Sequence, residues 1–463
     1  MFKNGLRKRA AIVGLVAWVT ASGLAVGQSP ADVIYAGGDG VTNNDKQPKA
    51  EAGAIKDGKL VAVDGESRQE SGSTLQKRPT LFGNWGGVRG ELAEHGIGVS
   101  AYLTQFYGGL TAGDGNRHFE YGGKADLLMN INGEKIGLWD GFTIIIHGEF
   151  NFDKNANSRG GVLIPTNTAM LLPNNNSAGG DLTNVSFVQR IGKRASLVFG
   201  KINMVDAYSA GSWYSGGAGI TKFQNLQFVA PLSGITPPVI LGAILSVKAE
   251  TAAYTFAVYD PEYIVHRTGL DHPFREGVSF MGSVELKSNF GQMPGKHKFS
   301  ANYSTQDGIN LKDIPIIFLP PEAQVPLQSK DQRYFFSYGF EQSLVKGSKP
   351  GEGWGLFGQV SLSDANPNPF AGLVTVGIGG SSLIPGRGQD SFGVGLYYQS
   401  FSRHLKDGIR PVFDLGNEFG SEIFYNVAVT RWFRVTPNLQ IADPGLRDRS
   451  TAVQFGLRAQ IVF

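Results

Sequence analysis

The sequence contains no cysteine among its 463 residues. This absence excludes a scaffold held by disulfides, a zinc site with cysteine ligands and catalysis by a thiol. An excess of one charge is also missing, because 42 lysines and arginines stand against 39 aspartates and glutamates. Nucleic-acid-binding proteins usually carry a clear basic excess, so this balance argues against a nucleic-acid partner.

Long apolar runs are missing after the N-terminus, so the sequence does not predict a bundle of membrane-spanning helices. The N-terminus itself is typical of a secretory signal peptide. A basic stretch, Met1–Arg9, precedes the apolar run Ala10–Val19 and the small residues Ala25 to Gly27. A membrane anchor is the alternative, but polar residues interrupt the run before it reaches the ~20 residues of a span. We therefore expect residues 1–27 to be a signal peptide that takes the protein out of the cytoplasm.

Residues 28–78 differ in composition from the rest of the chain. They are rich in Gly, Asp, Lys, Glu, Ser and Gln, and Tyr35 is their only aromatic residue. Such a segment buries too little apolar surface to offset the entropy that it loses on ordering. We expect a disordered polar extension, and contact with the cell wall or with a periplasmic partner is the alternative interpretation.

Residues 79–463 alternate apolar side chains with polar or small ones. The alternation is clearest in Phe142–Phe152, Tyr334–Glu341, Trp354–Leu362, Phe392–Gln399 and Thr451–Phe463. A period of two indicates strands with one apolar face. Clusters of Gly, Asn, Asp and Pro separate the segments, and a strand with its turn and loop takes roughly 20–25 residues. The predicted fold is all-β, a transmembrane antiparallel β-barrel of about 16 strands.

The second face of the strands distinguishes a membrane barrel from a soluble β-sandwich or propeller. In Thr451–Phe463 one face is apolar up to the last residue, which resembles the C-terminal assembly signal of outer-membrane barrels. The other face carries Arg458 among glutamines and small residues. Glu149 and His147 share the polar face of their own segment, where Ile145 is an apolar exception. Such a mixed face suits a water-filled lumen.

Two stretches between strands, Lys154–Gly180 and Ile202–Gly219, are long enough to fold into the lumen and narrow it. The second contains aromatic residues, whose rings bind the apolar faces of sugars. The candidate pore-lining residues are Glu149, His147, Trp213, Tyr214 and Arg458. Two alternatives stay open: a surface loop with aromatic residues at the membrane interface, and charged residues that merely pair across the inner wall.

Motifs of catalysis are missing. The sequence has no Walker loop, no G-x-S-x-G and no H-E-x-x-H. We therefore predict no catalytic residues, no cofactor and no metal ligands.

Four segments carry a resemblance to a known family. They are Leu81–Ile97 with its order Trp85-Gly-Gly-Val-Arg89, Phe199-Gly-Lys201-Ile-Asn, Trp432–Pro444, and Gly456-Leu-Arg458 with the terminal Phe463. Together they resemble the carbohydrate-selective porins of the OprB family, and the resemblance covers about residues 79–463.

The resemblance implies an outer-membrane barrel, usually of about sixteen strands, that passes monosaccharides and related sugars passively. It also implies that arginine and acidic side chains line the constriction, and Arg458 and Arg89 are the arginines that lie on matched motifs. The stretch Val88–Glu94 has the length of about two helical turns, with Gly96 as a cap. Arg89 therefore belongs either to the pore lining or to a short helix that braces the periplasmic mouth.

The predicted function is a passive outer-membrane channel for small sugars, selective by a constriction in its lumen. A general or differently selective porin is the first alternative, followed by an outer-membrane barrel enzyme and a secreted sugar-binding protein. The expected partners are small sugars, outer-membrane lipid and the barrel-assembly machinery, which would recognise the C-terminal strand. For the oligomeric state, a homotrimer and a monomer both remain alternatives.

Overall fold

The computed structural model describes most of the chain beyond the polar N-terminal region. The described residues are 55–56, 59–60, 75, 78–174, 177–210, 220–230, 232–319, 326–347 and 353–463. The signal peptide predicted for residues 1–27 lies outside them, as does most of the extension predicted for residues 28–78.

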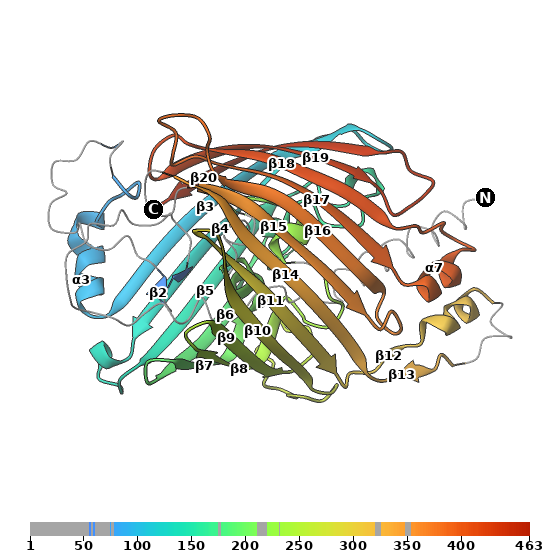
Figure 1. Cartoon of the computed structure of the whole chain (residues 1–463), viewed down its shortest axis with the longest axis horizontal. Helices are drawn as coiled ribbons and strands as arrows, with labels where there is room; N and C mark the ends of the chain where they lie inside the picture. The colour runs from blue at the N-terminus through green and yellow to red at the C-terminus, as the bar shows by residue number, and fades with distance from the viewer. Residues whose placement is uncertain are drawn as a thin grey trace.

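Sixteen strands of the described chain form a closed antiparallel barrel (Figure 1). Each strand pairs with its neighbour in sequence, and the last strand closes the barrel against the first, with Leu457 opposite Tyr107. The structure therefore confirms the predicted all-β barrel and its number of strands. The barrel strands are β3 (Ile97–Ala112), β4 (Phe119–Asn132), β5 (Phe142–Asp153), β6 (Gly179–Ile191), β7 (Ala195–Asn203), β8 (Val239–Lys248), β9 (Ala252–Tyr259), β10 (Ser279–Phe290), β11 (Met293–Ser304), β14 (Arg333–Lys346), β15 (Gly353–Ser363), β16 (Phe370–Ser381), β17 (Ser391–Phe401), β18 (Glu418–Ala428), β19 (Phe433–Asp443) and β20 (Ala452–Val462).

The remaining elements are short. Two-residue strands pair as β1 (Ile55–Lys56) with β2 (Lys59–Leu60) and as β12 (Gly308–Ile309) with β13 (Ser329–Lys330). The helices are η2 (Trp85–Gly87), α3 (Val88–Glu94), η3 (Glu134–Ile136), η4 (Arg159–Gly161), η5 (Thr168–Met170), α4 (Met204–Ala210), α6 (Leu226–Val229), η6 (Leu311–Phe318) and α7 (Arg403–Ile409). Within the described ranges, no helix has both the length and the apolar character needed to cross a membrane.

The barrel wall is apolar on its outer face and polar on its inner face, which is the reverse of a soluble protein. In β20, Phe455 and Leu457 point outward and are 42% and 41% exposed, whereas Arg458 points inward and is 1% exposed. Alternate residues of a strand face opposite sides, so this contrast recurs around the barrel. A soluble sandwich would hide its apolar face, whereas an exposed apolar outer wall is typical of a transmembrane barrel.

The two ends of the barrel differ in the length of their connections. At one end, strands join through short turns such as 192–194, 249–251 and 291–292. At the other end, the connections are long, as in 154–178, 204–238, 260–278 and 305–332. Figure 1 places α3 and the C-terminus at the short-turn end and α7 at the long-loop end. The short helix predicted at Val88–Glu94 therefore lies at the short-turn end, and short turns are typical of the periplasmic end of outer-membrane barrels.

Candidate functional site

The described residues 154–174 and 177–178, named here the first inward loop, are attached to the inner wall by the carboxylate of Glu418. Glu418 of β18 accepts hydrogen bonds from the backbone N–H groups of Leu163 at 2.7 Å and Ile164 at 3.1 Å. The same carboxylate accepts from Gly445 N–H at 3.2 Å and from the Tyr397 hydroxyl at 3.0 Å. Because Glu418 points into the barrel, this attachment holds the loop inside the lumen.

A second carboxylate attaches another loop in the same way. The second inward loop comprises the described residues 220–230 and 232–238. Glu422 lies four residues after Glu418 on the same strand face and accepts from the N–H groups of Gln224 at 2.7 Å and Asn225 at 2.8 Å. Arg458 donates to the carbonyl oxygen of Lys222 at 2.9 Å, which fastens the start of this loop to β20.

Side-chain amides join the two inward loops at strand β19. Gln440 donates to the carbonyl oxygen of Thr166 in the first loop at 2.7 Å and accepts from the Asn225 amide in the second at 3.0 Å. The Thr166 hydroxyl also donates to Gln454 of β20 at 3.0 Å. Both loops are therefore held by the wall and by each other.

Phenylalanine rings pack the second inward loop onto the wall. The ring of Phe223 lies 4.6 Å from that of Phe228 and 4.9 Å from that of Phe424 in β18, with the latter pair edge to face. Glycines in β17 make room for these rings, because a Cβ at Gly393 would lie 2.4 Å from Phe424 and one at Gly395 would lie 2.6 Å from Phe228. Some of the 64 glycines of the sequence thus permit close packing inside the barrel.

Charged side chains gather on another part of the inner wall, on β4 and β5. Lys124 forms ion pairs with Glu149 and, at 3.4 Å, with Asp126. His147 reaches Asp126 at 3.0 Å through Nε2 and Asp206 of α4 at 2.6 Å through Nδ1. An ionised carboxylate only accepts hydrogen bonds, so both ring nitrogens of His147 donate. This set, named here the charged wall cluster, thus ties α4 to the barrel.

The charged wall cluster includes three residues of metal-ligand type. Potential ligand atoms of Asp126, His147 and Glu149 lie within 4.8 Å of one another. The ammonium of Lys124 already bonds Glu149 and faces Asp126, so a lysine supplies positive charge at this position. The arrangement is that of an ion-pair network, in which each carboxylate has a cationic partner.

The structure places the sequence-predicted residues in three settings. Glu149 and His147 come together in the charged wall cluster, and Arg458 points inward and holds the second loop. Trp213 and Tyr214 lie outside the described residues.

Arg89 is in α3, outside the lumen. It donates to the carbonyl oxygen of the terminal Phe463 at 2.5 Å and to the Thr80 hydroxyl at 3.0 Å, and its guanidinium lies over the ring of Trp85. Of the two roles open for Arg89, the contacts are those of a brace between α3 and the end of β20.

The described inward contacts come from both predicted stretches and from one further segment. The first inward loop lies within the stretch predicted for residues 154–180. The second predicted stretch, 202–219, covers the end of β7, α4 and residues outside the described ranges. Its Asp206 contacts His147 of the inner wall, and the described residues between 220 and 238 add the contacts of the second inward loop. Phe223 and Phe228 carry the aromatic packing there.

Sequence reasoning missed Glu418, Glu422, Lys124 and Asp126. The two glutamates share one strand face at a spacing of four, and Lys124 and Asp126 share one face at a spacing of two. The signal that could have identified these four residues is a charged side chain on the polar face of an alternating strand. Their partners are up to 255 positions away, and only the closed barrel brings them together.

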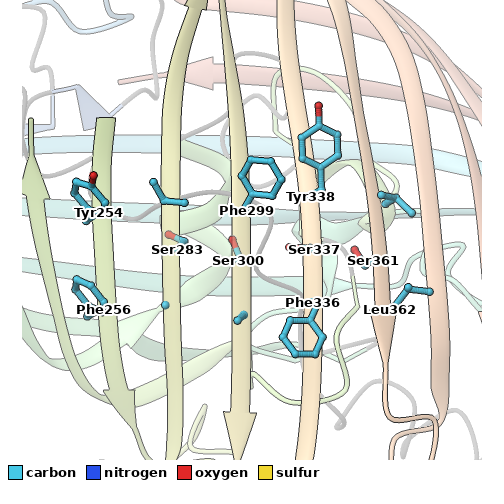
Figure 2. Close-up of a pocket in the computed structure, with 14 residues that line it drawn as sticks. Tyr254, Phe256, Ser283, Phe299, Ser300, Phe336, Ser337, Tyr338, Ser361 and Leu362 are labelled. Carbon is cyan, nitrogen blue, oxygen red and sulfur yellow. The ribbon is translucent and has the colours of Figure 1, made fainter. Parts of the chain in front are cut away.

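A groove of about 640 Å³ lies in the outer surface over β9 to β15 (Figure 2). The small residues Gly282 and Ala301 form part of its lining, with aromatic side chains on either side. Its exposed rings, such as Phe256 and Phe336, point outward, so the groove is not part of the lumen.

Comparisons with known proteins agree with this architecture. The sequence model described as "Carbohydrate-selective porin, OprB family" matches residues 117–463. The Leu81–Ile97 segment lies before the matched range. The high-pH structure of Pseudomonas putida OprB is similar with 17% identity and a TM-score of 0.72, covering 84% of this chain and 100% of that one. The low-pH structure of the same protein has 14% identity and a TM-score of 0.53, with 84% and 99% coverage. A search of curated proteins found no significant match.

The likeness to solved structures supports the fold, and the family match covers well over half of the chain. The barrel closes, its outer wall is apolar, and two loops are fastened inside it. The chain belongs to the OprB family of carbohydrate-selective porins and forms a carbohydrate-selective channel in the outer membrane.

Proposed function

We propose that the channel passes monosaccharides and similar small sugars down their concentration gradient, and that the two inward loops set its selectivity. The attachment of both loops inside the barrel through Glu418 and Glu422 carries this proposal. Fixed loops keep the opening at a constant width, so solutes are sorted by size and by their fit to the lining.

The inner wall around these loops is polar and contains both signs of charge, and the charged wall cluster within it is almost fully buried. In the charged wall cluster, the cations of Lys124 and His147 face the carboxylates of Asp126, Glu149 and Asp206. The cluster fixes the wall in place, and polar groups held at fixed positions are what sugar hydroxyls require of a channel. A simple ion gains less from such a lining, because each charge there already has a partner.

Single-channel recording with sugars tests the proposal. The mature protein, inserted in a planar bilayer, is expected to give discrete current steps that millimolar glucose reduces or blocks. An amino acid of equal size is expected to leave the current unchanged. Steps that respond equally to both solutes would contradict selection by the loops and favour a general porin. A folded barrel without any steps would contradict the channel itself and would reopen the enzyme alternative.

We also infer that residues 1–27 direct export and that β20 is the strand that the barrel-assembly machinery recognises, while lipid covers the outer wall. The support is the apolar outward row of β20, which continues to Phe463, whose ring lies 5.4 Å from that of Phe82. Deletion of Phe463 is expected to reduce the amount of heat-modifiable barrel in the outer membrane severalfold. Unchanged amounts would contradict recognition through this residue.

A further inference from the structure

A second groove lies in the outer surface of the barrel, next to the short-turn end. Its volume is about 460 Å³, and β17, β18, β19 and β20 form its wall with side chains such as Val394, Ile423 and Phe455. Clefts that bind small molecules have volumes of roughly 300–1,000 Å³, so this groove has the size of a ligand site. A ligand in the membrane can reach it, because Ile423 and Phe455 are 45% and 42% exposed.

The turn between β16 and β17, residues 382–390, forms one side of this groove. Leu383 and Ile384 of the turn line the groove together with the wall, and they are 65% and 55% exposed. The Ser382 hydroxyl lies 2.7 Å from the Tyr425 hydroxyl of β18, which fastens the turn to the strand beyond β17. An apolar chain in the groove therefore meets the turn as well as the wall, whereas the plain outer wall offers contact on one side.

The turns beside the groove carry an excess of positive charge. Residues 382–390 and 428–434 together have a net charge of +2, from Arg387, Arg431, Arg434 and Asp390. Hydrogen bonds join these two segments. Arg434 donates to the carbonyl oxygen of Gln389 at 3.1 Å, and the Asp390 carboxylate accepts from the N–H group of Ala428 at 2.9 Å. The basic side chains therefore belong to one corner of the barrel.

Arg387 is held in a fixed position next to the apolar lining. Its guanidinium donates to both carboxylate oxygens of Asp390, at 2.7 and 2.9 Å, and the Tyr425 hydroxyl donates to the same carboxylate at 3.1 Å. The Asp390 side chain is 2% exposed, whereas the Arg387 side chain is 41% exposed. The backbone N–H group of Arg387 donates to the carbonyl oxygen of Ile384 at 3.1 Å. A planar guanidinium that is fixed and partly exposed suits the oxygens of a phosphate group.

The groove and the arginines lie where the barrel meets the polar surface of the bilayer. The short turns end the strands at this level, and the half-buried Trp432 lies in the neighbouring turn 429–432. Aromatic side chains form girdles at the two interfaces of outer-membrane barrels. A phospholipid at this level has its acyl chains against the apolar wall and its phosphate group beside the turns.

We propose that this groove binds one anionic phospholipid of the leaflet at the short-turn end, with an acyl chain between Leu383, Ile384 and the wall and with its phosphate group at Arg387. The inference rests on the proposed lipid cover of the outer wall and adds a defined site to it. The excess of positive charge favours an anionic headgroup over a neutral one. A second copy of the chain fits less well, because a two-fold contact would bring two basic turns together.

Native mass spectrometry of the mature channel with added phospholipid tests the site. We expect one phosphatidylglycerol to stay bound per chain, at a severalfold lower lipid concentration than phosphatidylcholine requires. Arg387→Gln is expected to weaken phosphatidylglycerol binding about fivefold, as the loss of one basic side chain does at an anionic lipid surface, and to leave phosphatidylcholine binding unchanged. Arg387→Lys keeps the charge and is expected to retain most of the binding.

Arg403→Gln is the matched control for the charge, because Arg403 pairs with Asp407 at 3.6 Å at the long-loop end. Val394→Trp fills the groove and is expected to abolish the binding of phosphatidylglycerol. Val284→Trp puts the same ring on the outer face of β10, in the other groove, and is expected to leave this binding unchanged.

Three results would overturn the site: equal binding of the two lipids, phosphatidylglycerol binding that survives Val394→Trp, and a dimer of the channel that only Val394→Trp dissociates. The third result would show that a second copy fills the groove. If Arg387→Gln does not assemble, the comparison of the two lipids and Val394→Trp still decide. A barrel that stays soluble without detergent would contradict the lipid cover itself, whereas a detergent-dependent barrel that binds neither lipid overturns this site alone.

Discussion

Replacing Glu418 by alanine is expected to raise the single-channel conductance severalfold and to admit sugars larger than a disaccharide. The Glu418 carboxylate accepts from three backbone N–H groups and from the Tyr397 hydroxyl. Each donor left unpaired in a buried site costs about 1–3 kcal/mol. The first inward loop then loses its hold on β18, and the lumen widens where the loop had lain.

Planar-bilayer recording and liposome swelling with sugars of increasing size measure this effect. Glu341→Ala is the matched control, because Glu341 is also a buried, inward-facing carboxylate, and its ion pair at 3.5 Å is with Lys296 of the wall rather than with a loop. The control is expected to keep the wild-type size limit. A Glu418→Ala barrel that folds and keeps the wild-type conductance would show that the loop does not set the width of the channel.

Replacing Lys124 by methionine is expected to destabilise the barrel by about 3–5 kcal/mol, because it leaves buried carboxylates without their cation. Lys124 forms ion pairs with Asp126 and Glu149, and all three side chains are almost fully buried. The variant is also expected to shift the channel toward cation selectivity, since the negative charge of the cluster is then less compensated. The temperature of heat modification and the reversal potential in a salt gradient measure the two effects.

The double variant Lys124→Met with Glu149→Gln serves as the control for this prediction. It removes one charge of each sign, so it is expected to recover much of the stability and the original ion selectivity. If both variants are equally unstable, the loss comes from packing at Lys124 and not from the unpaired charge. Wild-type stability in the single variant would contradict the ion-pair network itself.

The sequence by itself determined the class of fold and which side chains of each strand point outward. A strand has a period of two whatever its neighbours are, so alternation alone predicts which residues point outward, as for Phe455 and Leu457. The helix at Val88–Glu94 follows from equally local rules, with a positive φ of 85° at Gly96 after its end. Ile145 breaks the alternation because this part of the inner wall is covered by apolar side chains. It belongs to a buried apolar cluster that also includes Leu163, Ile164 and Phe223 of the inward loops.

Only the tertiary structure decided what the inward side chains do. Alternation places Glu418 and Arg458 on the inner face, but their partners are backbone groups of loops that are distant in sequence. The direction of every inward side chain likewise depends on register, because a shift of one residue in a strand would turn that side chain toward the outer face. The pairing register of the strands and the points at which the loops attach to the wall follow from closure of the whole barrel. No single segment of the sequence encodes that closure. For that reason local patterns predicted a channel, while the attachment of its inward loops became visible only in the assembled barrel.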